Sequence, residues 1–166
     1  MTTQPRSFPD YAAALRTAYE EEVSGESYFA RLAEFHPGRA AEALRLMARM
    51  ERVTAAAVKP AIRRHAIPCT DPDQLRSEGR AEADRMAGWS WDRLVRDMRD
   101  NFAPYVTEFE RLAARAPDAD KPATRLLVDH ERAIIRFAEL DAAGDLESHT
   151  PLLAYLARFA GTAPAR

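Results

Sequence analysis

Apolar residues recur every three or four positions along most of the chain, and proline or glycine interrupts this pattern at only a few places. Such spacing puts apolar side chains on one face of an α-helix. The first stretch carries Leu15, Phe29 and Leu32 on that face and ends before Pro37. It predicts a helix over residues 9–35, because proline disfavours continuation of a helix.

Four further segments follow the same rule. A second helix is expected over residues 40–62, and the short connection before it makes the two helices antiparallel neighbours. A third is expected over residues 90–117 with Pro104 inside it, so that this helix should bend. A fourth is expected from Pro122 to Gly144, and a short fifth helix over residues 150–159.

The pattern weakens between the second and third helices. Residues 67–90 begin with a proline-rich loop, and residues 74–86 favour a polar helix. This segment is expected to be a long crossover. The chain is therefore predicted to be all-α: one four-helix bundle over residues 9–160 with a fifth short helix, flanked by flexible termini at residues 1–8 and 161–166.

Composition excludes several classes of function. The chain has 24 basic and 26 acidic residues, scattered along the predicted helices, which argues against nucleic acid or a membrane surface as the main partner. Cys69 is the only cysteine, so no disulfide can form within one chain, and a cytoplasmic location is expected. Residues 1–10 lack an apolar leader, and no uncharged run is long enough to span a bilayer.

Each long helix places one glutamate where the apolar spacing predicts the core. An unpaired buried carboxylate is costly and therefore requires an explanation. If the four side chains converge, they would form a carboxylate cluster inside the bundle. These residues are Glu22, Glu51, Glu108 and Glu131.

This arrangement resembles the ferritin-like superfamily, especially its rubrerythrin-like members. The resemblance covers about residues 10–143, rests on spacing and topology, and includes segments 19–23, 50–54, 105–110 and 129–132. It implies a carboxylate-bridged pair of iron or manganese ions and an oxidoreductase that acts on oxygen, peroxide or a small molecule. The metal ligands it implies are Glu22, Glu51, Glu108 and Glu131.

The chain departs from the family pattern at two ligand positions. The family uses a Glu-x-x-His sequence on each of two helices, whereas here Thr54 follows Glu51 and Ile134 follows Glu131. His130, beside Glu131, would be a metal ligand if the helix were rotated by one residue.

Other interpretations of the same residues remain open. Surface exposure or ion pairs with Arg16, Arg49 or Arg52 would explain the glutamates without chemistry. A metal-free bundle would use Glu51 or Glu131 as a general acid or base of raised pKa beside Tyr28, Tyr105 or His130, or would bind a small ligand. A third interpretation is a non-catalytic interaction or assembly module, and a homodimer is expected.

Overall fold

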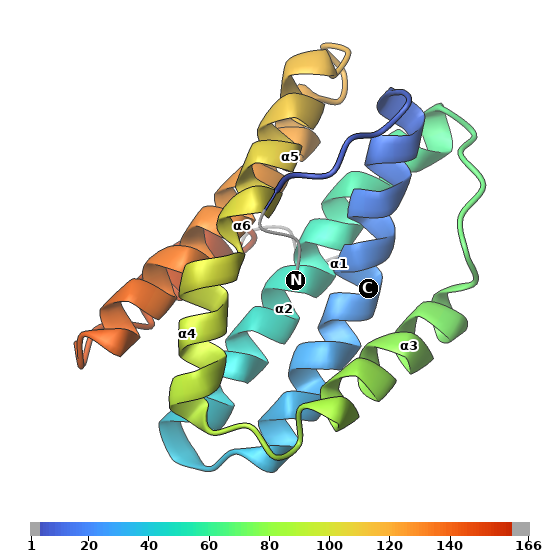
Figure 1. Cartoon of the computed structure of the whole chain (residues 1–166). Helices are drawn as coiled ribbons and strands as arrows, with labels where there is room; N and C mark the ends of the chain where they lie inside the picture. Colours follow the sequence, from blue (N-terminus) through green and yellow to red (C-terminus); the bar gives the residue numbers. More distant parts are fainter. Residues whose placement is uncertain (1–3, 161–166) are drawn as a thin grey trace.

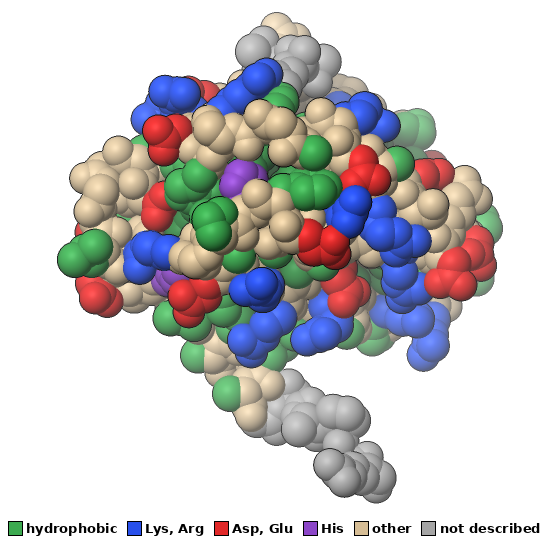
Figure 2. Space-filling model, turned by 90° about the horizontal axis from the view of Figure 1, so that it is seen from below, with side chains coloured by type: hydrophobic (Ala, Val, Ile, Leu, Met, Phe, Trp, Pro, Cys, Tyr) green, Lys and Arg blue, Asp and Glu red, His purple; other side chains and the backbone are tan. Residues whose placement is uncertain are grey.

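The computed structural model describes residues 4–160, and the expected flexible end at residues 161–166 lies outside that range. Within the described residues the chain forms seven α-helices and no strand, which confirms the all-α prediction (Figure 1). None of these helices has the length and apolar character needed to cross a membrane. On the end of the molecule shown in Figure 2, basic and acidic side chains lie beside one another.

The first two helices form an antiparallel pair, as predicted. Helix α1 spans Tyr11–Phe35, and the side chain of Asp10 caps it by accepting a hydrogen bond from the Ala13 amide at 2.8 Å. Helix α2 spans Gly38–Arg64 and runs along α1 for most of its length. Gly38 has a positive φ of 57°, which suits glycine at this tight connection.

The crossover folds back as a helix onto α1. Helix α3 spans Pro72–Arg85 and begins two residues earlier than predicted, because Asp71 caps it and proline suits its first turn. It packs closely on α1 at Gly79, where a Cβ atom would lie 2.1 Å from the backbone oxygen of Ser24. Only glycine therefore permits this packing.

The third predicted helix is divided in two, so the expectation of one continuous helix over residues 90–117 was wrong. Helix α4 spans Trp91–Asn101, and helix α5 spans Ala103–Arg115. Pro104 lacks an amide hydrogen and its ring would clash with the preceding turn, so the chain breaks at Phe102 and restarts. This break at Phe102 lies six residues before Glu108.

Helix α6 spans Lys121–Ala142 and packs against α4, α5 and α2. The short helix α7 spans Thr150–Ala157 and packs on α2 and α6. By contrast, α1 and α5 make few contacts with each other, and the N-terminal segment crosses between them (Figure 1). The bundle is thus more open on this side.

The hydrophobic core consists of two separate clusters. One includes Phe29, Met47 and Phe137, and the other includes Leu15 and Leu127. On each of α1, α2 and α6, buried polar residues lie close to the boundary between the two clusters. The candidate site lies in this polar layer, whose residues are Glu22, Glu51, Thr54, His130 and Glu131.

Candidate functional site

Three buried side chains from three helices meet in the polar layer. Glu22 comes from α1, Glu51 from α2 and His130 from α6, and one ligand atom of each lies within 4.8 Å of the other two. His130 Nδ1 is 3.4 Å from Glu22 Oε1, and His130 Nε2 is 3.4 Å from Glu51 Oε1. Their exposed fractions, 2%, 6% and 1%, exclude the interpretation of Glu22 as a surface residue.

The three side chains are near one another without being tightly hydrogen-bonded. Charge-assisted N–H···O bonds are usually about 2.7–2.9 Å long, shorter than both contacts of His130. Neither ring nitrogen of His130, nor Glu22 Oε2, has a hydrogen-bond partner among the described residues. Buried polar atoms without partners are rare, so these atoms are available to an additional group.

Burial and mutual charge shift the protonation of this cluster. Burial raises the pKa of Glu22 well above its ordinary value, despite the opposing effect of His130. For His130, burial opposes the charged form, but the carboxylates of Glu22 and Glu51 outweigh it and raise the pKa well above 6.5. Without another cation, protons on His130 and Glu22 lower the net charge of the cluster.

Glycine in α1 makes room for the carboxylate from α2. A Cβ atom on Gly25 would lie 2.6 Å from Glu51 Oε2 and 2.7 Å from Glu51 Cδ. Any larger residue would therefore displace the Glu51 carboxylate. Gly25 is one turn beyond Glu22, so the sequence of α1 supplies both a polar group and the space for its neighbour.

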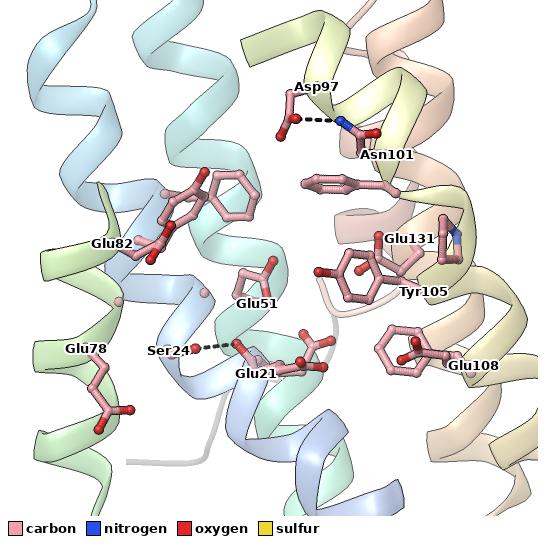
Figure 3. Close-up of a pocket in the computed structure, with 18 of the residues that line it drawn as sticks. Glu21, Ser24, Glu51, Glu78, Glu82, Asp97, Asn101, Tyr105, Glu108 and Glu131 are labelled. Atoms are coloured by element: carbon pink, nitrogen blue, oxygen red, sulfur yellow. Dashed lines mark hydrogen bonds between the residues drawn. The ribbon is translucent and has the colours of Figure 1, made fainter. Parts of the chain in front are cut away.

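A pocket of about 620 Å³ opens beside the polar layer between α1, α3, α4 and α5 (Figure 3). Glu22 and Glu51 line it, whereas His130 does not and lies behind them. Glu131 also lines the pocket, and its Oε2 atom has no hydrogen-bond partner among the described residues. A small molecule in this pocket would reach the cluster from its carboxylate side.

Burial gives Glu131 unusual acid–base properties. Its pKa is raised from 4.5 to about 8, first by burial and then by neighbouring carboxylates, with His130 opposing the shift. Tyr28 and Tyr105 line the same pocket, and burial raises the pKa of both phenols. The Tyr28 hydroxyl donates to Met86 Sδ at 3.1 Å. At pH 7 all three side chains are predominantly neutral.

Glu108 lines the pocket but does not join the group of Glu22, Glu51 and His130. Arg6 holds it instead, because the Arg6 guanidinium donates to Glu108 Oε2 at 2.6 and 2.9 Å and its backbone amide donates to Oε1 at 2.5 Å. The same guanidinium donates to Glu21 at 2.6 and 3.0 Å. Glu108 is therefore a partner of the N-terminal segment.

Sequence reasoning missed Arg6 because residues 1–8 carry no helical pattern and were expected to be a flexible terminus. Phe8 and Tyr105 flank the guanidinium, with ring centroids 5.5 and 5.4 Å from its central carbon. The only local signal was an arginine and an aromatic residue close together in a polar segment. Such a pair does not indicate which carboxylates it will reach.

The two positions at which the resemblance implied histidine lie in the core. The Thr54 hydroxyl donates to the Met50 carbonyl oxygen at 2.7 Å and lies 2.6 Å from the Tyr155 hydroxyl. Ile134 is buried in an apolar cluster. His130 packs against the Tyr155 ring, with centroids 5.7 Å apart. An imidazole thus reaches the polar layer, but from a position one residue before Glu131.

In the part of the chain that the structure describes, the arginines considered from sequence form no ion pair with Glu22 or Glu51. Arg16 pairs with Glu20 at 3.0 Å, and Arg52 lies 3.9 Å from Glu26. The ionic neighbour of Glu51 is His130. Arginine pairing therefore does not explain the burial of Glu22 and Glu51.

No protein-family model, curated protein or solved structure matches this chain.

Proposed function

We propose that this chain is a ferritin-like bundle protein that binds iron or manganese through Glu22, Glu51 and His130 and acts as an oxidoreductase on a small molecule. The observation that carries the proposal is the meeting of these three side chains, with unpartnered nitrogen and oxygen atoms, in a buried layer beside a pocket. Carboxylate oxygen and imidazole nitrogen together suit such ions.

The electrostatics of the cluster support a cation. Two buried carboxylates and one imidazole carry their charges at a high desolvation cost. A divalent ion would replace the proton on His130 and offset both carboxylates. The raised pKa values of Glu22 and His130 are then a property of the metal-free protein, in which protons occupy these side chains in place of the metal ion.

The residues fit one ion better than the pair that the resemblance implied. Thr54 and Ile134, which stand where histidine ligands were expected, pack in the core. The carboxylate of Glu108 is hydrogen-bonded to Arg6. Glu131, which was also expected to be a metal ligand, lies on the pocket wall instead. We therefore propose that one ion per chain binds at Glu22, Glu51 and His130.

Within this proposal each residue has a distinct role. A bound iron or manganese ion would supply the electron-transfer chemistry. Glu131 would hold a bound molecule at the pocket wall through its carboxyl group, whose Oε2 atom has no hydrogen-bond partner among the described residues. Tyr28 and Tyr105 would position that molecule, and the polar layer is bordered by an apolar cluster on either side.

Metal stoichiometry tests the proposal directly. Chelator-treated protein would be loaded with iron(II) without oxygen, or with manganese(II), and analysed for metal per chain after desalting. About one ion per chain is expected, and Glu51→Gln should lose it because an amide is a weaker ligand. Glu82→Gln, on the pocket wall but outside the cluster, is the matched control. Failure of the unaltered protein to bind either ion would refute the proposal.

A second function, metal-free acid–base catalysis, is favoured by Glu131 alone. Its unpartnered Oε2 atom faces the pocket, and a pKa of about 8 suits a general acid near neutral pH. An activity that persists in chelator-treated protein and is lost in Glu131→Gln would support this function. Loss of that activity on chelation would support the metal-dependent one.

A further inference from the structure

The pocket wall is strongly acidic. Helices α1 to α6 all contribute a carboxylate side chain to it, as the labelled residues in Figure 3 show. Among the described residues that line the pocket, the basic ones are Arg6 and Arg85. The acidic ones are Glu21, Glu22, Glu51, Glu78, Glu82, Asp97, Glu108 and Glu131. A concave wall of one charge sign concentrates ligands of the opposite sign.

Two of these carboxyl groups are buried and have one oxygen atom without a hydrogen-bond partner among the described residues. Glu22 is 2% exposed and Glu131 is 9% exposed, and one oxygen of each has no hydrogen-bond partner among the described residues. The cluster of Glu22, Glu51 and His130 accounts for the first. Glu131 remains, on the opposite side of the pocket from α1 and α2 (Figure 3).

Arg6 of the same chain shows which kind of chemical group this pocket wall binds. Its guanidinium lies between Glu21 and Glu108 and packs against the Tyr105 ring at 5.4 Å from the centroid. Two carboxylates and an aromatic face are the groups that bind organic cations in proteins. Arg6 is thus an internal cation at one edge of the pocket.

The rest of the wall would accommodate an apolar body. Aromatic side chains line the pocket from α1, from the break between α4 and α5, and from α5 itself. These residues are Tyr28, Phe29, Phe102, Tyr105 and Phe109. A volume of about 620 Å³ is in the range of sites that enclose small organic ligands.

We infer that the pocket binds an organic amine as its cation, with the ammonium group beside Glu131 and an apolar or aromatic body against Tyr28 and Tyr105. This inference rests on the proposed function, because it names the class of substrate that the proposed site would bind. Binding itself is measured separately from metal loading, so the two can fail independently.

Isothermal titration calorimetry with three matched probes tests the inference. Phenethylamine, 2-phenylethanol and phenylacetate share a ring and differ in charge, and each would be titrated into chelator-treated and manganese-treated protein at pH 8. Phenethylamine should bind at least about tenfold more tightly than the alcohol, as expected for a charged group paired in a buried site, and phenylacetate should not bind.

Two variants locate the ammonium group. Glu131→Gln should weaken phenethylamine binding about tenfold, whereas Glu78→Gln, at the exposed rim of the pocket, should change it less than about twofold. Tyr105→Leu should weaken phenethylamine binding while leaving metal content unchanged.

Several outcomes would overturn the inference: equal binding of amine and alcohol, tighter binding of phenylacetate, or amine binding that Glu131→Gln leaves intact. Amine binding without any metal uptake would support the amine site and refute the metal proposal. Metal uptake without amine binding, in both chelator-treated and manganese-treated protein, would support the metal proposal and refute the amine site.

Discussion

Gly25 of α1 and Glu51 of α2 are in such close contact that one added methyl group could not fit between them. A Cβ atom on Gly25 would lie 2.6 Å from Glu51 Oε2. Because Glu51 Oε1 is 3.4 Å from His130 Nε2, this contact also fixes the distance between the α2 carboxylate and the α6 imidazole. The geometry of the cluster therefore depends on a residue that has no side chain.

Gly25→Ala should separate site geometry from stability. The Glu51 carboxylate would move, since it is the flexible end of a side chain, while alanine favours the helix by about 0.5–1 kcal/mol. We expect unchanged or slightly higher stability, about tenfold weaker metal binding, and a lowered pKa of His130 as Glu51 withdraws. Urea denaturation, metal titration and NMR titration of the imidazole measure the three effects.

Gly88→Ala is the control for that variant, because nothing lies within 4 Å of a Cβ atom at Gly88. It should leave metal binding and the pKa of His130 unchanged. If Gly25→Ala behaves like Gly88→Ala in both measurements, the contact between Gly25 and Glu51 does not control the cluster.

Gly79→Ala should destabilise the protein, because its Cβ would meet the backbone oxygen of Ser24 at 2.1 Å and a backbone cannot move aside alone. Helix α3 would have to shift away from α1, at a cost of about 1–3 kcal/mol. Urea denaturation measures this cost. A loss no larger than that of Gly88→Ala would show that α3 is not tightly packed on α1.

Arg6→Ala should destabilise the protein by removing the partner of a buried carboxylate. Glu108 is 6% exposed and takes three hydrogen bonds from the Arg6 guanidinium and one from its backbone amide. We expect a loss of about 1–2 kcal/mol, below the full cost for a buried pair because the Arg6 side chain is 37% exposed.

Arg16→Ala is the matched control, since Arg16 pairs with Glu20 on the surface and should contribute less than about 1 kcal/mol. In Arg6→Ala/Glu108→Gln, removal of the buried charge should recover part of the lost stability. Equal losses in Arg6→Ala and Arg16→Ala would contradict an anchoring role for the N-terminal segment.

Stability of the metal-free protein should fall as pH rises from about 5 to about 8. Glu131 keeps its proton up to a pKa of about 8 when folded but releases it near 4.5 when unfolded, so the folded state binds more protons in this window. The loss from this residue is on the order of 3 kcal/mol. The raised pKa values of Glu22 and His130 act in the same direction.

Urea denaturation in the presence of a chelator, at several pH values, measures that slope. Glu131→Gln should have a shallower dependence, because glutamine does not titrate, and should be the more stable protein at pH 8. The same slope in both proteins would show that Glu131 does not carry a raised pKa.

Periodic spacing was sufficient to place the four glutamates in the interior, where each is at most 9% exposed. Glu22, Glu51 and Glu131 occupy core positions of long amphipathic helices, and helical geometry alone puts such residues inside a bundle. The rotation of α6 was not determined in this way. His130 and Glu131 differ by about 100° around the helix, and packing against Tyr155 set which of them joined Glu22 and Glu51.

The sequence by itself determined most of the helices, the interruption at Pro37 and the polar positions within apolar stripes, because these depend on local backbone chemistry and on spacing along one element. It predicted a bend at Pro104 but not the division into two helices there. Only the tertiary structure decided that Arg6 takes Glu108 out of the cluster and that Gly25 admits Glu51. Both contacts join segments that are far apart in the chain. The partners are therefore selected by long-range packing and charge rather than by local backbone preference.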